Sequence, residues 1–170
     1  VGAYSIYPWT ATIEPVQVVS FLPGPYRIAN YAARVRAVAA NKTLTGAYRG
    51  VGRPISVFVM ARLLDMAARK NGMVPAEIRR RHLVNDDEFP YKAASGLVWD
   101  KSAFQACLRE AADGIGYDEL RREQAAARAD GRWVGIGVAC YAELTGVGSR
   151  IAVAPGMPIN TGTETCNVAI

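Results

Sequence analysis

The sequence of 170 residues is poor in the side chains that build metal sites and nucleophilic sites, because it has one histidine and three cysteines. Cys107, Cys140 and Cys166 are odd in number and widely separated, which excludes a Cys-x-x-Cys metal pattern and argues against a disulfide framework. A protein-built zinc site or a Ser-His-Asp device would depend on His82, which ends a charged helix. We therefore interpret the cysteines as small buried hydrophobic residues and expect a reducing, cytoplasmic environment.

Long apolar runs are also missing from the sequence. No run approaches the roughly 18 apolar residues that a spanning helix needs, so no membrane span is expected. The composition, with 51% hydrophobic and 21% charged residues, is that of a globular domain and excludes disordered and collagen-like classes. The first residues contain no initiator methionine and no signal-peptide pattern, and Thr165–Ile170 resembles an interrupted strand. We therefore expect an internal fragment of a longer protein.

Acidic residues are scarce in the middle of the chain. Between Arg34 and His82 there are eleven Lys or Arg and two Asp or Glu residues, whereas the formal net charge of the whole chain is +5. This basic block suits a non-enzymatic module that binds RNA or an acidic partner, although only Tyr48 and Phe58 supply aromatic rings there. The alternative is that the basic side chains line solvated helix faces or a subunit contact. These side chains are Arg62, Arg69, Lys70 and Arg79–Arg81.

The N-terminal third of the sequence has the pattern of extended chain and loop. Residues 1–21 are predicted to be extended, with breaks at Pro8 and Pro15 and with Val16, Val18 and Val19 in a strand. Arg34–Val38 alternates polar and apolar residues, which is the period of a strand. Asn41–Pro54 is predicted to be a loop because it is rich in glycine.

The strongest helix signal starts at Pro54, since proline is favoured at the first helical position. Lys70-Asn71-Gly72 should end this helix, with a cation in the last turn and glycine as a left-handed cap. Helical spacing predicts its buried face, which consists of Met60, Leu63, Leu64 and Ala67.

Further helices and strands follow in the second half. The predicted helices are Pro75–His82, a helix capped by Asp100 or Ser102 that runs to about Ala112, and Asp118–Asp130. The predicted strands are Trp133–Leu144 and Thr165–Ile170. This mixture favours an α+β fold with about four helices. A composition change near Gly131 marks the one plausible domain boundary.

The sharpest chemical signal is the glycine loop Gly46–Pro54, which leads into a helix. Glycine allows positive φ angles, and amides in front of a helix N-terminus favour anions. Arg49 and Arg53 flank the turn and can bind oxyanions. A dinucleotide fingerprint fails because Ile55 stands where a third glycine is needed, and Arg53-Pro54 replaces the Lys-Ser/Thr pair of a P-loop. These residues alone leave open an anion-binding loop or a tight structural turn.

The loop and the helix behind it resemble the large subunit of the molybdenum hydroxylases, the family of xanthine dehydrogenase, aldehyde oxidase and aerobic carbon monoxide dehydrogenase. Further motifs follow the order of that family along nearly the whole chain. They are Met73–Arg81, Glu88–Tyr91, Ser95–Asp100, Gly135–Glu143 and Gly146.

The resemblance implies an oxidoreductase subunit that hydroxylates an aldehyde or a heterocycle with water as the oxygen source. Residues 1–130 would be the C-terminal part of a first molybdopterin-binding domain, and residues 131–170 the beginning of a second α+β domain that also binds molybdopterin. The cofactor would be molybdopterin with molybdenum, in bacteria often as the cytosine dinucleotide. FAD and iron–sulfur clusters would lie on a medium and a small partner subunit of a hetero-oligomer that binds a small-molecule substrate and no nucleic acid.

The resemblance also implies roles for single residues. The backbone at Ala47, Tyr48, Arg49 and Gly50 would border the ligands of molybdenum, with Arg49 nearest the metal, and Val51 would line the substrate pocket. Carbon monoxide dehydrogenases have a copper-binding cysteine at the position of Gly50, which argues against carbon monoxide oxidation. Xanthine oxidases have an aromatic residue at the position of Val51, which argues against a purine substrate.

The resemblance places the general base of the family, a glutamate, outside this chain. Glu143 and Glu164 are therefore not assigned this role, and we expect no catalytic residue within the chain and no activity of the chain alone. Two non-enzymatic alternatives remain at this point. One is the basic binding module, and the other is a purely structural domain in which the glycine loop only turns the chain.

Overall fold

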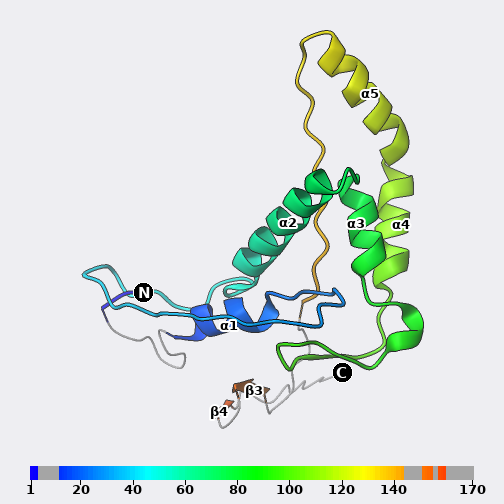
Figure 1. Cartoon of the computed structure of the whole chain (residues 1–170). Coiled ribbons are helices and arrows are strands. Elements are labelled where there is room, and N and C mark those ends of the chain that lie inside the picture. Colours follow the sequence, from blue (N-terminus) through cyan, green and yellow to red (C-terminus); the bar gives the residue numbers. More distant parts are fainter. Residues whose placement is uncertain (4–11, 144–150, 155–156, 160–170) are drawn as a thin grey trace, which may run out of the picture.

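Helices dominate the part of the chain that the structure describes, which is residues 1–3, 12–143, 151–154 and 157–159 of a computed structural model (Figure 1). Its α-helices are α1 (Ile13–Phe21), α2 (Arg53–Lys70), α3 (Pro75–His82), α4 (Phe104–Gly114) and α5 (Tyr117–Ala129). The remaining elements are the 3-10 helix η1 (Asp86–Glu88) and the strands β1 (Tyr91–Lys92), β2 (Val98–Trp99), β3 (Ile151–Ala154) and β4 (Met157–Ile159). The mixture confirms the predicted α+β class, with one helix more than expected.

The strands form two small antiparallel pairs. β1 pairs with β2, so that Tyr91 lies opposite Trp99, and β3 pairs with β4. Neither pair is large enough to carry a core. In the described residues the packing instead runs from α1 to α2, from α2 to α3 and from α3 to α4. An isolated bridge between Tyr26 and Leu83, both buried, joins the turn after α1 to the end of α3.

The prediction of extended structure up to residue 21 is wrong for residues 13–21, which form α1. The predicted strand residues Val16, Val18 and Val19 are therefore helical. Pro15 does not break the chain because it is the third residue of the helix, where a backbone N–H has no helical acceptor. The Val16 N–H then donates to the Thr12 carbonyl at 3.1 Å. Residues 4–11 of the same prediction lie outside the described residues.

Two further strand predictions are also wrong. Arg34–Val38 is irregular and exposed at every position, and 133–143 is irregular too. A strand needs a partner, and no described residue pairs with either segment in a ladder. Leu144 and Thr165–Ile170 lie outside the described residues.

Helix α2 confirms the predicted boundaries, with Pro54 in its first turn and Gly72 beyond its end at φ 64°. Its predicted buried face is wrong at Leu63, whose exposed fraction is 52%. The fully buried positions are instead Ser56 and Ala68. These small side chains allow the close approach of neighbouring helices, and the Ser56 hydroxyl donates to the Val18 carbonyl of α1 at 2.8 Å.

The C-terminal helices confirm the prediction in outline. α4 begins at Phe104 without a side-chain cap, so the predicted caps are wrong, and the Ser102 hydroxyl donates to the Asp100 carbonyl instead. α5 lies within one residue of its predicted bounds and projects away from the other helices (Figure 1). The chain then returns along it, with Gln124 Nε2 donating to the Val134 carbonyl at 2.7 Å. No helix in the described residues is long and apolar enough to cross a membrane.

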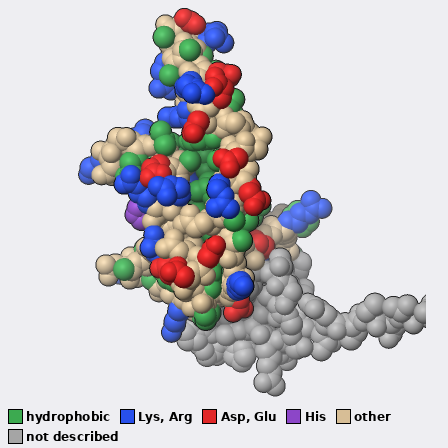
Figure 2. Space-filling view, turned by 90° about the vertical axis from the view of Figure 1, so that its right-hand side faces the viewer, with side chains coloured by type: hydrophobic (Ala, Val, Ile, Leu, Met, Phe, Trp, Pro, Cys, Tyr) green, Lys and Arg blue, Asp and Glu red, His purple; other side chains and the backbone are tan. Residues whose placement is uncertain are grey.

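Some of the basic side chains between Arg34 and His82 are buried or paired with carboxylates, so fewer of them can bind a partner than the composition indicates. The prediction that Arg79 lines a solvated helix face or a subunit contact is wrong, because its side chain is completely buried. Its guanidinium pairs with Asp65 at 2.9 Å and donates to the carbonyls of Pro75 and Ala61, so it joins α3 to α2. On the face shown in Figure 2, basic and acidic side chains are interspersed. A continuous cationic face is therefore not visible from this side.

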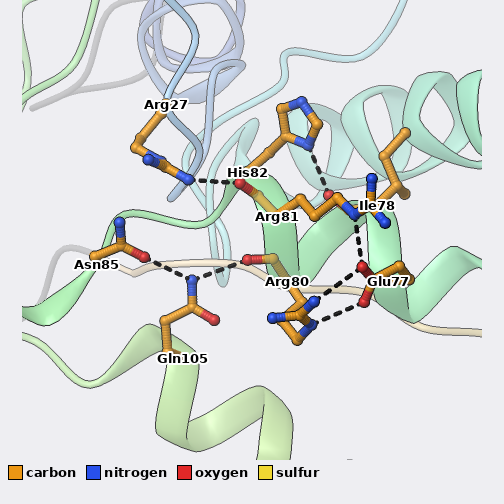
Figure 3. Close-up of polar contacts among 8 residues, drawn as sticks. All are labelled: Arg27, Glu77, Ile78, Arg80, Arg81, His82, Asn85 and Gln105. Carbon is orange, nitrogen blue, oxygen red and sulfur yellow. Dashed lines mark hydrogen bonds and ion pairs between the residues drawn. The ribbon is translucent and has the colours of Figure 1, made fainter.

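The two neighbouring arginines pair within α3 itself. Arg80 and Arg81 both bind the carboxylate of Glu77, at 2.8 and 2.6 Å (Figure 3). Hydrogen bonds from Arg80 and then Arg81 lower the pKa of Glu77 to about 2. Because the carboxyl pKa is lowered in the folded state, the pair stabilises the fold at pH values above the ordinary pKa of glutamate. This stabilisation is lost as the pH falls toward 2.

Neighbouring elements hold the C-terminal end of α3. Gln105 of α4 donates to the Arg80 carbonyl at 3.0 Å, and Arg27 donates to the Arg81 carbonyl at 2.5 Å (Figure 3). His82 is exposed, and its Nδ1 lies 2.8 Å from the Ile78 carbonyl. These contacts provide partners for carbonyl groups that a helix end leaves unsatisfied, and they give His82 a role in the helix end.

An alanine at Asp65 should destabilise the protein strongly, because it leaves the buried Arg79 cation without its counter-charge. We expect Asp65→Ala to cost about 3–5 kcal/mol of unfolding free energy. The matched control is Glu119→Ala, which breaks an exposed pair with Arg122 and should cost below about 1 kcal/mol. Thermal unfolding of both variants checks this, and equal shifts of the midpoint would contradict it.

Candidate functional site

The loop in front of α2 has an unusual backbone. Four consecutive residues have positive φ angles: Arg49 at 20°, Gly50 at 78°, Val51 at 34° and Gly52 at 61°. Glycine adopts this region freely, but a β-branched valine there is a genuine outlier. Such strain costs on the order of 1–3 kcal/mol per residue and is concentrated at ligand sites. The backbone alone therefore marks this loop as a candidate site.

The loop keeps its shape because both its end and its interior are tightly packed. A Cβ on Gly52 would lie 2.4 Å from the Glu14 carbonyl oxygen of α1, so only glycine fits there. The N–H of Arg53 is shared between the carbonyls of Gly50 at 3.0 Å and Val51 at 2.5 Å. The loop is thus closed upon itself and pressed against α1.

The tip of the loop has donors without acceptors. Among the described residues, the backbone N–H groups of Tyr48, Arg49, Gly50 and Gly52 donate no hydrogen bond, and Arg49 pairs with no carboxylate. The Arg49 guanidinium instead lies 5.6 Å from the ring centroid of Tyr48, whose exposed fraction is 77%. With the positive end of the α2 dipole behind it, the tip is suited to a negatively charged ligand.

Arg53, the second arginine of the loop region, is not available to bind an anionic ligand as Arg49 is. Arg53 pairs with Glu143 at 2.7 Å, and its guanidinium lies 4.6 Å from the ring centroid of Phe21. Arg53 is therefore already engaged by a carboxylate, and Arg49 stays the candidate for binding an oxyanion. Sequence reasoning missed the Arg53–Glu143 pair, because no spacing rule links residues so far apart.

The other candidate side chains do not gather into a site. In the described residues no group of three or more His, Cys, Asp or Glu side chains could hold a metal ion. Cys107 is exposed, which corrects the prediction of a buried cysteine, and Cys140 is half-buried with a thiol pKa raised by burial. Cys166 and Glu164 lie outside the described residues. Glu143 pairs with Arg53.

A separate groove of about 660 Å³ lies between α4 and the returning segment. Leu83, Phe104, Cys107, Cys140 and Tyr141 are among its lining residues, none of the lining residues is charged, and none belongs to the glycine loop. This largely apolar groove has no cationic side chain that could offset the charge of an anionic ligand.

Residues 1–83 match the model of the molybdopterin cofactor-binding domain. A gamma subunit of a 6-hydroxypseudooxynicotine dehydrogenase complex from Paenarthrobacter nicotinovorans is 35% identical over 74% of the chain. The nicotine 6-hydroxylase large subunit of the same organism is 31% identical over 91% of the chain. Quinoline 2-oxidoreductase from Pseudomonas putida 86 superposes with a TM-score of 0.81, at 35% identity over 88% of the chain.

The chain spans less than a fifth of each of these proteins: 16% of the first, and 19% of the second and of the third. The class that these matches define is a molybdopterin-binding domain. The chain belongs to the large subunits of the molybdenum hydroxylases, as its motifs indicate.

The fit of Gly52 against α1 can be tested with a matched pair of variants. Gly52→Ala should cost about 2–4 kcal/mol, because it combines a left-handed backbone with a backbone clash. Gly72 has nearly the same φ, 64°, but nothing within 4 Å of its Cβ position, so Gly72→Ala should cost only about 1 kcal/mol. Thermal unfolding compares the two, and the close contact has no energetic role if the shifts are equal.

Proposed function

We propose that the protein containing this chain is a molybdopterin-dependent oxidoreductase that hydroxylates a heterocycle or an aldehyde, with water as the source of oxygen. The observation that carries the proposal is the strained tip of the loop in front of a helix N-terminus, where, among the described residues, backbone N–H groups have no acceptor and Arg49 pairs with no carboxylate. The names of two relatives refer to nicotine and quinoline, both of which contain aromatic nitrogen rings, and this favours a heterocycle over an aldehyde.

The residues at the loop fit an anionic cofactor. Molybdopterin carries a phosphate group, and its metal carries electron-rich ligands, so free N–H donors and one free guanidinium are the partners that it needs. We assign the backbone of Ala47, Tyr48, Arg49 and Gly50 to the border of the cofactor, with Arg49 nearest the metal. When bound, the cofactor supplies the two-electron redox centre, and these chain residues orient it and offset its negative charge.

Val51 is our candidate for a wall of the substrate pocket. Its side chain follows the cofactor-binding residues directly and is small and apolar, so it leaves room beside the cofactor without stacking on a planar ring. Gly50 has no side chain that could hold a second metal, which argues against a copper-dependent reaction. Both assignments rest on the position of the loop.

The rest of the machinery would lie outside this chain. Two relatives are named as subunits of larger enzymes, and we propose a cytoplasmic hetero-oligomer with an FAD-binding medium subunit and an iron–sulfur small subunit. The pterin would be the cytosine dinucleotide form, and the general base a glutamate elsewhere in the large subunit. Within the chain, we place the boundary between two molybdopterin-binding domains near Gly131, where α5 ends.

Metal and pterin analysis of the full-length enzyme tests the central proposal. The wild type should contain molybdenum and pterin in amounts close to those of the large subunit. Arg49→Ala should lower the molybdenum content or the turnover by about tenfold or more, because it removes a charge-assisted contact.

The matched control is Arg36→Ala, because Arg36 is exposed and forms no ion pair among the described residues. This variant should behave as the wild type. A wild-type enzyme without molybdenum, made in a host that synthesises the cofactor, would refute the proposal.

A bulkier residue at position 51 should change substrate preference. We expect Val51→Phe to raise the KM for bicyclic heterocycles about tenfold while leaving small aldehydes less affected, because the new ring fills the proposed pocket. Molybdenum content should stay at the wild-type level, which separates the pocket from cofactor binding. A uniform loss over all substrates would place Val51 outside the pocket.

A further inference from the structure

Arg53 connects three parts of the molecule at the base of the glycine loop. Its backbone N–H closes the loop on the carbonyls of Gly50 and Val51. Its guanidinium pairs with Glu143 at 2.7 Å and lies against the ring of Phe21 in α1. One residue thus links the loop, helix α1 and the segment that returns from α5.

The Glu143 carboxylate is needed to balance the charge of the Arg53 guanidinium, which is mostly buried. The exposed fraction of the Arg53 side chain is 16% and that of Glu143 is 36%. Arg53 Nε is buried, and within the part of the chain that the structure describes it has no hydrogen-bond partner. Arginine cannot lose its charge in a protein, so the half-buried cation needs Glu143 as its counter-charge. Without this carboxylate, the guanidinium is driven toward water.

A movement of Arg53 would change the backbone conformation of the glycine loop. The positive φ angles of Arg49 and Val51 are strained, and strained backbone persists only where its surroundings over-determine it. The close contact of Gly52 with α1 is one such constraint. The position of Arg53, one residue further on, is the second.

We propose that the Arg53–Glu143 ion pair is a positioning device that holds the strained shape of loop 46–52 by fastening its base to the returning segment. Arg53 and Glu143 are positioning residues, because they act on the ligand through the loop backbone. The inference about loop shape stands on the geometry described here. Its consequence for the cofactor rests on the proposed function.

The experiment is limited trypsin digestion of the full-length enzyme, purified in its complex from a host that cannot make pterin. Trypsin can cut the exposed Arg49–Gly50 bond when the loop opens. It does not cut the Arg53–Pro54 bond, because proline follows the arginine. Glu143→Gln should speed this cut about three- to fivefold, since that is the scale by which a partly exposed ion pair shifts a local opening equilibrium.

Two controls confine the effect to the loop. Glu119→Gln removes a carboxylate from an ion pair on α5 and should leave the Arg49–Gly50 cut at the wild-type rate. Cleavage after Arg36, which lies in exposed irregular chain, should not change in any variant. A rise at both bonds would mean general loosening and would overturn the proposal.

Variants of the partner residue separate the ion pair from simple packing. Arg53→Met should speed the cut as Glu143→Gln does, and Arg53→Lys, which keeps the charge, should restore a rate near that of the wild type. The double variant Arg53→Met/Glu143→Gln should be no faster than either single variant, because both remove the same interaction. Additive effects, or no rescue by lysine, would overturn the proposal.

The cofactor-loaded enzyme supplies a separate result. Glu143→Gln should lower its molybdenum content about threefold, while Glu119→Gln should not. If the wild type carried no molybdenum, the proposed function would fail, but the trypsin rates would still decide whether the pair holds the loop. Wild-type cleavage rates in Glu143→Gln would overturn the positioning role whatever the metal content.

Discussion

The close contact between α1 and the start of α2 is the constraint on which the rest of this structure depends. Gly52 lies so near the backbone of α1 that no side chain fits between them, and Ser56, one turn later, hydrogen-bonds to the same helix. This contact fixes where α2 begins and therefore where the glycine loop ends. The tip of the loop is left exposed at Tyr48 and Arg49, while its base is packed against α1.

The remaining helices support this contact from the far end of α2. The buried guanidinium of Arg79 joins α3 to α2, and Gln105 and Arg27 hold the end of α3. An edge-to-face aromatic chain then joins α1 through Trp99 to α4, with centroid distances of 6.0 Å for Phe21–Trp99 and 6.3 Å for Trp99–Phe104. In the described residues the scaffold is thus helical, and the strand pairs play a minor part.

Local signals predicted the later helices, because proline, glycine and helical spacing act through the backbone of neighbouring residues. They failed for α1, where Pro15 lies in the one turn that tolerates it, and for the irregular segments, whose alternating pattern had no partner strand. The loop was found from its own glycines and arginines. Local patterns could not predict that Arg53 is paired with a carboxylate while Arg49 is not. They also could not predict that Arg79 is buried within a run of three arginines. Both depend on contacts between residues distant in sequence.

Arg49, which forms no ion pair with any described residue, also affects the rate at which an anion would bind. A cation at the tip of an exposed loop acts on an approaching anion before any hydrogen bond forms, over a screening length of about 10 Å at 0.1 M salt. We therefore expect the rate at which an anionic ligand binds to the loop to fall as ionic strength rises. Arg53, neutralised by Glu143, contributes little to that field. Arg49 thus attracts the ligand at a distance, whereas Arg53 holds the loop in place.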